Sequence, residues 1–263
     1  MHTVKEKFSV IIPVYNEANV IEKNLKEVKS TFDEFGCAYE IIVIDDGSED
    51  TSYQLLKRLE RRIPNLIVKR NSQNFGKGRA LKKAFKYTTG DLIVWLDADL
   101  DLHPFQVKTL YDIMVLDDAD VVVGSKLHPN SKLYYPFYRR LITLGYYVII
   151  CFLFNLPCHD TQTGLKIFKR KVLREVFPRI LVKKFAFDLE VLLNAHYLGF
   201  RIVEAPIVVE NRRNFYRIGV RSIANVLWDT LAVWYRMYIL RYYDRINYYR
   251  RKNLRKELRR VHK

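Results

Sequence analysis

The chain is poor in cysteine. Its 263 residues include only Cys37, Cys151 and Cys158, and no two of them form a Cys-x-x-Cys pair. This scarcity excludes a disulfide framework and the usual zinc and redox motifs, so a reducing cytosolic environment is expected. The first apolar stretch is only a few residues long and is broken by Pro13, which predicts a strand rather than a signal peptide.

Long apolar runs are also missing. Leu141–Leu156 contains no charged residue, but it is only 16 residues long and is bounded by Arg139-Arg140 and Pro157. A helix that crosses a bilayer needs about 20 apolar residues. The segment is therefore expected to be either a buried core helix or a helix in the membrane interface, and the sequence leaves both open.

Acidic residues are few relative to basic ones. The chain has 45 Lys and Arg against 29 Asp and Glu, a net charge of +16, and +11 of this lies in residues 201–263. Such an excess indicates an anionic partner: nucleic acid, a membrane surface or a phosphorylated substrate. Residues 220–250 show a helical pattern with Asp229 and Arg236 near its middle, which favours an interfacial helix over a span. Its apolar stripe consists of Ile223, Leu227, Leu231, Trp234 and Tyr238.

The first 125 residues alternate between apolar strand patterns and amphipathic helix patterns. No internal repeat or low-complexity segment interrupts them. Strands that are apolar throughout and alternate with helices predict an α/β fold, a doubly wound, mostly parallel, Rossmann-like sheet. The strands are expected at 8–15, 39–46, 66–70, 91–97 and 120–125, and the helices at 19–35, 51–62, 78–87 and 104–116.

Polar residues follow three of these predicted strands. Tyr15-Asn16-Glu17 follows the first, Asp45–Ser48 the second, and Asp97–Asp101 the fourth. In an open parallel sheet, ligands bind beyond the carboxyl ends of the strands. Turn formation or helix capping accounts for one such cluster but poorly for three at one edge. The sequence therefore predicts a binding site at this edge.

The sequence WLDADLD spaces Asp97, Asp99 and Asp101 at alternating positions. Carboxylates are hard oxygen ligands, so a shared cation there would be Mg²⁺ or Mn²⁺. Such an ion would bridge a diphosphate and neutralise its charge as it leaves.

The segment Phe75-Gly76-Lys77-Gly78 resembles a phosphate-binding loop but fits neither common pattern. It lacks the spacing of a P-loop, and it lacks the third glycine of a dinucleotide fingerprint. A P-loop nucleotidase and a nicotinamide dehydrogenase are therefore disfavoured. The Lys77 side chain could still face a phosphate.

Several motifs together resemble the inverting family 2 glycosyltransferases of GT-A fold. SVIIPVYNE, IIVIDDGSEDTS, NFGKGRAL and LDADLD occur in this order. VGSK at 123–126, RRLIT at 139–143, DTQTGLKIF at 160–168 and FAFDLEVL at 185–192 are similar to the polyprenyl-phosphate glycosyltransferases. The last two motifs are closer to the dolichyl-phosphate glucosyltransferases than to the mannosyltransferases. The resemblance covers about residues 8–210.

The resemblance implies a role for particular residues. Asp97, Asp99 and Asp101 would hold the metal, although the mannose branch often has Gln where Asp101 stands here. Lys126, at a position that is usually Arg, would receive the lipid phosphate together with Arg139 and Thr143. The implied catalytic residues are Asp99, Lys126, Arg139 and Asp188. The implied nucleotide-sugar residues are Pro13, Tyr15, Glu17, Asp45, Lys77, Asp97, Asp160, Gln162, Glu190 and Arg217, with Arg221 beside Arg217 in a basic loop.

The implied reaction is transfer of a hexose, with inversion, from UDP-glucose or GDP-mannose to polyprenyl (dolichyl) phosphate. A lipid phosphate is already an oxyanion near neutral pH, so no strong general base is needed. Catalysis then depends on holding two anions together and stabilising the leaving diphosphate. The expected arrangement is a catalytic domain over 1–210 and a membrane-association region over 211–263, peripheral or monotopic on the cytoplasmic face.

Two alternatives remain open. A soluble family 2 enzyme that extends a glycan would share the fold but would not need so apolar a segment at Leu141–Leu156. A non-enzymatic protein could bind nucleic acid through the basic, tyrosine-rich tail. No nucleic-acid-binding motif accompanies that tail, so no nucleic-acid partner is expected. The sequence also leaves open a homo-oligomer formed through the terminal helices.

Overall fold

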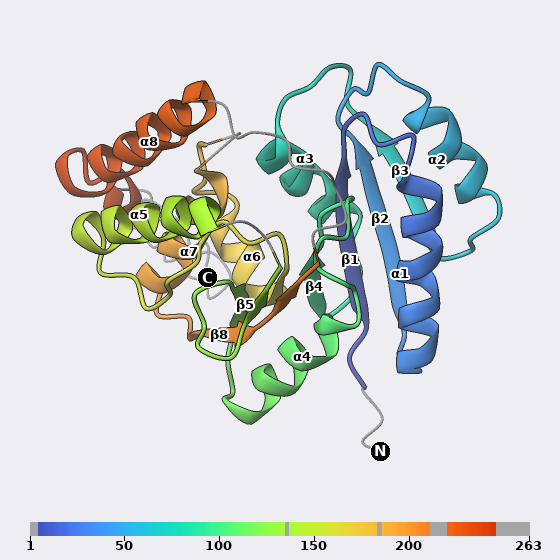
Figure 1. Ribbon diagram of the computed structural model, residues 1–263, viewed down its shortest axis with the longest axis horizontal. Coiled ribbons are helices and arrows are strands. Elements are labelled where there is room, and N and C mark those ends of the chain that lie inside the picture. The colour runs from blue at the N-terminus through green and yellow to red at the C-terminus, as the bar shows by residue number, and fades with distance from the viewer. Residues whose placement is uncertain (1–4, 135–136, 183–185, 211–219, 246–263) are drawn as a thin grey trace, which may run out of the picture.

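The computed structural model describes residues 5–134, 137–182, 186–210 and 220–245, with the backbone alone at 137–140 and 220–223 (Figure 1). Its centre is a seven-stranded sheet in the order β3-β2-β1-β4-β7-β5-β8. All neighbouring strands are parallel except β7, which is antiparallel to β4 and β5. The predicted α/β class with a mostly parallel sheet is confirmed. The strands are β1 (Phe8–Val14), β2 (Tyr39–Asp45), β3 (Leu66–Arg70), β4 (Leu92–Trp95), β5 (Val121–Ser125), β7 (Lys166–Lys169) and β8 (Ile202–Pro206).

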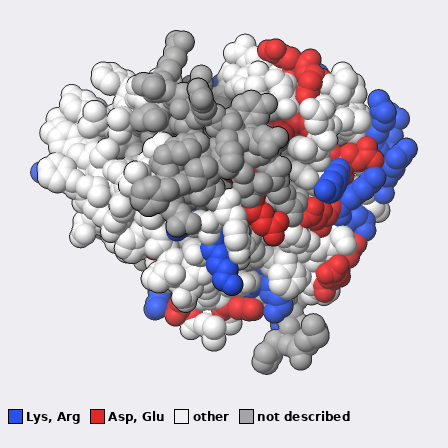
Figure 2. Space-filling model, viewed as in Figure 1, with Lys and Arg blue, Asp and Glu red and all other residues white. Residues whose placement is uncertain are grey.

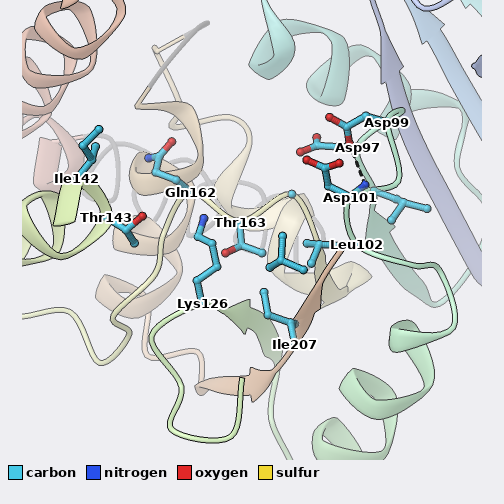
Figure 3. A pocket seen from close by; sticks show the side chains of 13 residues that line it. Asp97, Asp99, Asp101, Leu102, Lys126, Ile142, Thr143, Gln162, Thr163 and Ile207 are labelled. Atoms are coloured by element: carbon cyan, nitrogen blue, oxygen red, sulfur yellow. Dashed lines mark hydrogen bonds between the residues drawn. The ribbon is translucent and has the colours of Figure 1, made fainter. Parts of the chain in front are cut away.

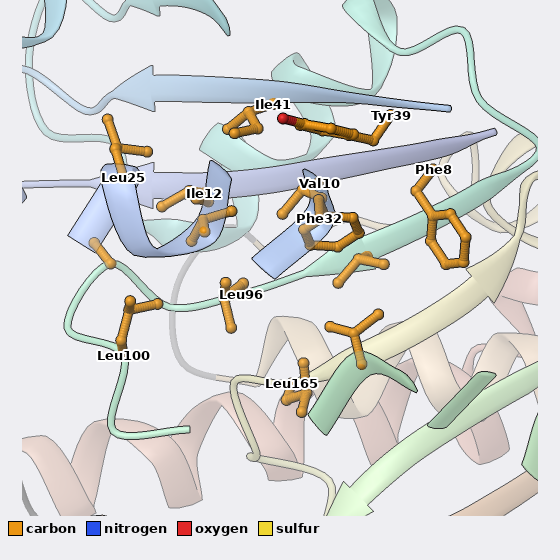
Figure 4. Close-up of a cluster of buried hydrophobic side chains, with 14 of the residues drawn as sticks. Phe8, Val10, Ile12, Leu25, Phe32, Tyr39, Ile41, Leu96, Leu100 and Leu165 are labelled. Atoms are coloured by element: carbon orange, nitrogen blue, oxygen red, sulfur yellow. The ribbon is translucent and has the colours of Figure 1, made fainter. Parts of the chain in front are cut away.

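Apolar side chains fill both faces of this sheet. Val10 and Ile12 of β1 belong to one buried cluster, while Ile11 belongs to a second. Because successive side chains of a strand point to opposite faces, these clusters are the two halves of the core. In the first, shown in Figure 4, Leu25 and Phe32 pack from α1 against the sheet. The flanking helices are α1 (Ile21–Phe35), α2 (Ser52–Glu60), α3 (Lys77–Ala84), α4 (Gln106–Leu116) and α6 (Arg170–Val176).

The antiparallel strand β7 was not predicted from the sequence. Its first residue, Lys166, lies opposite Trp95, the last residue of β4. Because β7 runs against its neighbours, the chain that leads into it crosses the edge where the parallel strands end. Residues 160–165 therefore lie beside the predicted binding site.

A small two-stranded sheet covers part of the same edge. It pairs β6 (Lys132–Leu133) with β9 (Val208–Val209) in parallel. An antiparallel bridge joins Leu102 to Val209, and the Glu210 N–H donates to the Asp101 carbonyl oxygen at 2.9 Å. These contacts fix the chain that follows β4 against the chain that follows β8.

Three further helices pack together beside the sheet: α5 (Phe137–Leu153), α7 (Phe187–Tyr197) and α8 (Val220–Trp234). Figure 1 shows α5 and α8 next to each other on the side away from β3. Ile150, Leu193 and Val233 bury a common apolar cluster between the three helices. The outer side of α5 exposes other apolar residues, so the Leu141–Leu156 segment is partly buried and partly open rather than one or the other.

The long terminal helix predicted over 220–250 is shorter in the structure. A π-helical turn, η2 (Tyr235–Ile239), follows α8, and Arg241 then adopts a left-handed backbone with φ of 47°. Residues 246–263 lie outside the described part of the chain. Among the described helices, none combines the length and the apolarity that crossing a bilayer requires.

Candidate active site

Two clefts open at the carboxyl edge of the sheet and adjoin at Asp97 and Asp99. They measure about 280 Å³ and 240 Å³. The first cleft is lined by Pro13, Val14, Tyr15, Glu17, Asp46, Asn74, Gly76, Lys77, Asp97, Ala98 and Asp99. The second cleft is lined by Leu96, Asp97, Asp99, Asp101, Leu102, Lys126, Ile142, Thr143, Gln162, Thr163, Gly164, Ile207 and Val209.

The end of β1 forms one wall of the first cleft. Asn16 adopts a left-handed backbone, with φ of 55°, and turns the chain between Tyr15 and Glu17. Its N–H donates to Ser48 Oγ at 3.0 Å, and its Oδ1 accepts the Glu49 N–H at 2.8 Å. These bonds join the ends of β1 and β2. The structure thus places Pro13, Tyr15 and Glu17 together, as the sequence predicted.

The second strand contributes Asp46 to this cleft rather than the predicted Asp45. The Asp45 side chain is fully buried, and its Oδ2 forms an ion pair with Arg70 Nε at 3.0 Å. Asp46 instead lines the cleft and accepts the Gly76 N–H at 2.7 Å and the Asn71 amide at 2.6 Å. The sequence contained both aspartates, but the direction of each side chain depends on where β2 ends.

The Lys77 and Asp97 side chains form an ion pair between α3 and the loop after β4. Lys77 Nζ lies 2.6 Å from Asp97 Oδ1. Burial acts to raise the pKa of Asp97, but the charge and hydrogen bond of Lys77, together with the charges of Lys166 and Lys126, lower it overall. On the other side of the same carboxylate, a Cβ atom added to Gly164 would lie 2.0 Å from Asp97 Oδ2. Asp97 is therefore held between a lysine and a glycine backbone.

Asp99 and Asp101 lie on a turn beyond the end of β4, where the sequence placed them. Between them Leu100 is buried and has φ of 52°, a left-handed conformation that is strained for a leucine. The Asp101 N–H donates to Asp99 Oδ1 at 3.3 Å. In Figure 3 the three carboxylates lie together on one side of the second cleft. Burial, then the charges of Asp97 and Asp101, raise the pKa of Asp99 to about 6.

These carboxylates suit a hard divalent cation in their chemistry, but they do not form a complete site by themselves. Among the described residues, no three His, Cys, Asp or Glu side chains are grouped so that they could hold a metal ion. One oxygen of Asp97 is already paired with Lys77. The crowding of negative charge around Asp99 is what a cation would relieve. The residues fit a metal whose remaining ligands come from a bound anion.

Lys126 lies across the second cleft from the aspartates (Figure 3). Its side-chain Nζ is 3.2 Å from Asp160 Oδ2, and its backbone N–H donates to the same oxygen at 3.0 Å. Thr163 Oγ1 donates to that oxygen too, at 2.6 Å. Burial acts to raise the pKa of Asp160, but the charge of Lys126 and the hydrogen bonds from Thr163 and the Lys126 backbone together lower it below its usual value. Asp160 is buried and lines neither cleft, so its visible role is to hold Lys126 rather than a sugar.

The rest of the second cleft is largely apolar. Leu102, Ile142, Ile207 and Val209 form its wall, and Thr143 and Gln162 add polar groups. Ile142 and Thr143 come from α5, the helix whose outer side exposes apolar residues. Sequence reasoning identified Thr143 and Gln162 but missed the wall, because its members come from three separate segments that only the folded chain brings together.

The acidic residues of α7 do not line either cleft. Asp188 Oδ1 lies 2.5 Å from Nζ of Lys166, a lysine that is fully buried. Glu190 is also fully buried, and its Oε2 accepts the N–H groups of Leu181 and Val182 at 3.0 and 2.8 Å. The other Glu190 oxygen accepts from Tyr243 and Arg236, which follow α8. Neither Asp188, expected to be catalytic, nor Glu190, expected to bind the nucleotide sugar, lines the described clefts, since both make internal contacts.

Some expected residues lie outside what the structure describes. Arg217 falls in the undescribed range 211–219. Arg139 and Arg221 belong to α5 and α8, but their side chains are not described. Their roles stay predictions.

The sequence of residues 9–177 matches the family described as Glycosyl transferase family 2. A dolichyl-phosphate beta-glucosyltransferase of Dictyostelium discoideum is 31% identical over 212 residues, which are 76% of this chain and 65% of that protein. Glycosyltransferase AglD of Haloferax volcanii is 26% identical over 231 residues, 87% of this chain and 37% of that protein. The chain thus spans less than two thirds of the length of either relative.

Solved structures share the fold. Glucosyl-3-phosphoglycerate synthase from Mycobacterium tuberculosis, solved with Mn²⁺, UDP and glucosyl-3-phosphoglycerate, superimposes with a TM-score of 0.66 at 21% identity. The superposition covers 88% of this chain and 79% of that one. The match supports the GT-A type of fold that the sequence motifs had indicated.

Proposed function

The chain belongs to glycosyltransferase family 2, and we propose that it transfers a hexose, with inversion, from a nucleoside diphosphate sugar to polyprenyl (dolichyl) phosphate. The observation that carries this proposal is the pair of clefts that adjoin at Asp97 and Asp99. One is polar and can take a nucleotide, and the other combines a lysine with an apolar wall. A reaction between two anions needs both to be bound at one junction.

The first cleft suits the donor. Tyr15 offers a partly exposed ring for a nucleobase, and Glu17 offers a carboxylate for hydroxyl groups of a ribose. Lys77 lies at the first position of α3 and supplies a positive charge for a diphosphate. We propose UDP-glucose as the donor ahead of GDP-mannose, because dolichyl-phosphate glucosyltransferases are among the relatives.

We propose that Mg²⁺ or Mn²⁺ binds with the donor at Asp97, Asp99 and Asp101. When bound, a divalent cation would neutralise the charge that develops on the leaving diphosphate. A related fold has been solved with Mn²⁺ and UDP together, which supports this proposal. The chain's own part is to present these carboxylates on the strained turn at Leu100.

The second cleft suits the acceptor. Lys126 would bind the lipid phosphate, with Thr143 beside it, while Leu102, Ile142 and Ile207 would contact the first isoprene units. An oxygen of that phosphate attacks the anomeric carbon as the bond from this carbon to the diphosphate oxygen breaks. The electron pair of the broken bond leaves with the diphosphate, and the configuration at the carbon inverts. A soluble glycan would find no matching contacts on the apolar wall.

We propose that α5 and α8 rest on the membrane surface. Phe152 on α5 is 89% exposed and Trp228 on α8 is 74% exposed. Figure 2 shows that few charged side chains lie over the described part of α5 and α8, while basic ones gather at the opposite edge near α2. Such a face suits peripheral or monotopic attachment through amphipathic helices. The three unpaired cysteines suit the cytoplasmic face.

We also propose that the chain divides into a catalytic domain, 1–210, and a membrane-association region, 211–263, because the second of these contains α8. Tyr146 of α5 bonds Thr230 of α8 at 3.0 Å, and the Gln162 amide lies 3.5 Å from the same tyrosine oxygen. The second region is thus tied to the second cleft through α5. A homo-oligomer through these helices stays a prediction.

A transfer assay tests the proposal. The purified chain would be incubated with labelled UDP-glucose or GDP-mannose and dolichyl phosphate in mixed micelles, with Mn²⁺ or with EDTA. We expect label in the organic phase, from one donor and only with metal. Label that appears solely on a water-soluble acceptor would contradict the proposed acceptor.

A further inference from the structure

The proposed metal site contains a lysine where a cation would be expected to bind. Nζ of Lys77 sits 2.6 Å from Oδ1 of Asp97, the first carboxylate of the Asp97–Asp101 turn. The second oxygen, Oδ2, faces the Gly164 backbone so closely that a Cβ atom there would overlap it. In this arrangement Oδ1 of Asp97 is paired with an ammonium group, whose positive charge repels a metal ion from the same oxygen.

The same lysine faces the first cleft, where the donor diphosphate is proposed to bind. Lys77 is the first residue of α3, and its neighbour Gly76 is fixed by a 2.7 Å bond from its N–H to Asp46. The helix start therefore stays in place when the lysine side chain moves. About a third of the Lys77 side chain is exposed, so it can exchange Asp97 for a phosphate without unpacking the core.

We propose that Lys77 controls the access of a metal ion to Asp97. Without donor, the lysine occupies Asp97 and the metal site is incomplete. When a diphosphate enters the first cleft it attracts Lys77, and Asp97 becomes available to complete the metal site with Asp99 and Asp101. Metal and donor therefore bind cooperatively, and each binds weakly alone. The inference rests on the proposed use of a divalent cation and a diphosphate donor.

Lys126 provides a matched comparison within the same pair of clefts. It too is a lysine paired with an aspartate, since its Nζ lies 3.2 Å from Asp160. Asp160, however, is not one of the proposed metal ligands. Replacing either lysine with methionine removes one positive charge near the acidic turn, so a general electrostatic effect on metal affinity would appear in both variants. Only Lys77→Met removes the competitor from Asp97.

The first test measures Mn²⁺ binding by electron paramagnetic resonance in the absence of nucleotide. We expect Lys77→Met to bind Mn²⁺ at least about fivefold more tightly than Lys126→Met, the lower end of usual coupling between linked sites. Lys77→Gln, which keeps a hydrogen-bond donor but no charge, should fall between Lys77→Met and the unaltered chain. Circular dichroism would establish that each variant is folded.

The second test measures the reciprocal effect on the anion. Inorganic pyrophosphate in EDTA serves as the probe, because it carries no base or sugar. We expect Asp97→Asn to bind it more tightly than the unaltered chain, since Lys77 is released. Asp99→Asn in the same assay controls for the loss of one negative charge in this cleft, because it leaves Lys77 paired with Asp97. Equal affinity in the two variants would contradict the inference.

Suppose that the unaltered chain binds Mn²⁺ together with UDP or GDP. Equal Mn²⁺ affinity in Lys77→Met and Lys126→Met would then overturn this inference and leave the proposed function standing. If the unaltered chain bound no Mn²⁺ with either nucleotide, the proposed function and this inference would both fail.

Discussion

Gly164 lies against the carboxylate of Asp97, at a distance that leaves no room for a Cβ atom. This contact joins the loop before β7 to the loop after β4, and so connects the two halves of the proposed active site. Both loops reach this point because β7 runs antiparallel to β4. The position of Asp97 therefore depends on a residue 67 positions further along the chain.

Gly164→Ala should move Asp97 and lower kcat by about 100-fold, the loss that a displacement near 1 Å can cause. The expected change in thermal stability is small, because the added methyl group meets a partly exposed carboxylate rather than the core. Steady-state kinetics and thermal melting would measure both. Gly145→Ala on α5 is the control, since a Cβ there meets nothing within 4 Å. Unchanged kinetics in Gly164→Ala would show that the contact is not needed.

Asp99→Asn should stabilise the metal-free chain at pH 7.5. The pKa of Asp99 is raised from 3.8 to about 6, so ionisation of this carboxyl in the folded state costs up to about 3 kcal/mol above pH 6. The cost declines as the pH falls below 6 and disappears below 3.8, where the group is protonated in both folded and unfolded chains. Asn keeps the acceptor for the Asp101 N–H.

Urea unfolding in EDTA at pH 7.5, 6 and 5 would follow this difference. We expect the advantage of Asp99→Asn to shrink steadily with falling pH, and the variant to have lost transfer activity. A difference that does not vary with pH would mean that the raised pKa of Asp99 is not the cause.

Lys126→Met should weaken the acceptor and spare the donor. Losing the positive charge at the end of the second cleft should lower kcat/KM for polyprenyl phosphate by about 100-fold, the effect of removing a charged hydrogen bond of roughly 3 kcal/mol. Binding of the donor nucleotide should stay within about twofold. Lys126→Arg should retain most activity, because a guanidinium also binds phosphate.

The exposed Lys108 on α4 pairs with Asp112 at 3.5 Å and serves as a charge-matched control for Lys126. If Lys108→Met and Lys126→Met had the same small effect, Lys126 would have no place in the acceptor site.

A double substitution on the proposed membrane face, Phe152→Ser with Trp228→Ser, should reduce partition onto anionic vesicles by at least about tenfold. Each side chain contributes roughly 1–2 kcal/mol when its apolar surface leaves water. Flotation of the chain with vesicles would measure it. Val115→Ser with Leu116→Ser removes exposed apolar surface from α4 instead, since these residues are 59% and 82% exposed. Equal losses in both double variants would contradict the assignment of α5 and α8.

Much of the fold could be predicted from the sequence because its first half obeys simple periodicities. The β1, β2 and β3 strands and the α1 helix lie within two residues of the ranges expected from apolar patterning. The convergence of Tyr15, Glu17, Asp97 and Asp99 also followed from the rule that parallel strands end at one edge.

The remaining features depend on contacts between distant segments. No local pattern distinguishes β7, with only four residues, from the parallel strands beside it. Lys166 reads as an ordinary surface lysine, yet it is fully buried against Asp188. Asp188 and Glu190 lie in the first turn of α7, and their sequence pattern is that of ligand-binding carboxylates. Only the packing of α7 shows that internal partners occupy both. Their pairing could not be derived from spacing.

The most direct test of the central proposal is the structure of the lipid product. The unaltered chain would be incubated with ¹³C-labelled UDP-glucose, dolichyl phosphate and Mn²⁺, and the organic phase examined by ¹³C and ³¹P nuclear magnetic resonance. We expect a single hexose joined through its anomeric carbon to the lipid phosphate in the β configuration, inverted from the α-linked donor. An α-linked product, or a lipid phosphate that stays unmodified while a soluble glycan gains the hexose, would contradict the account.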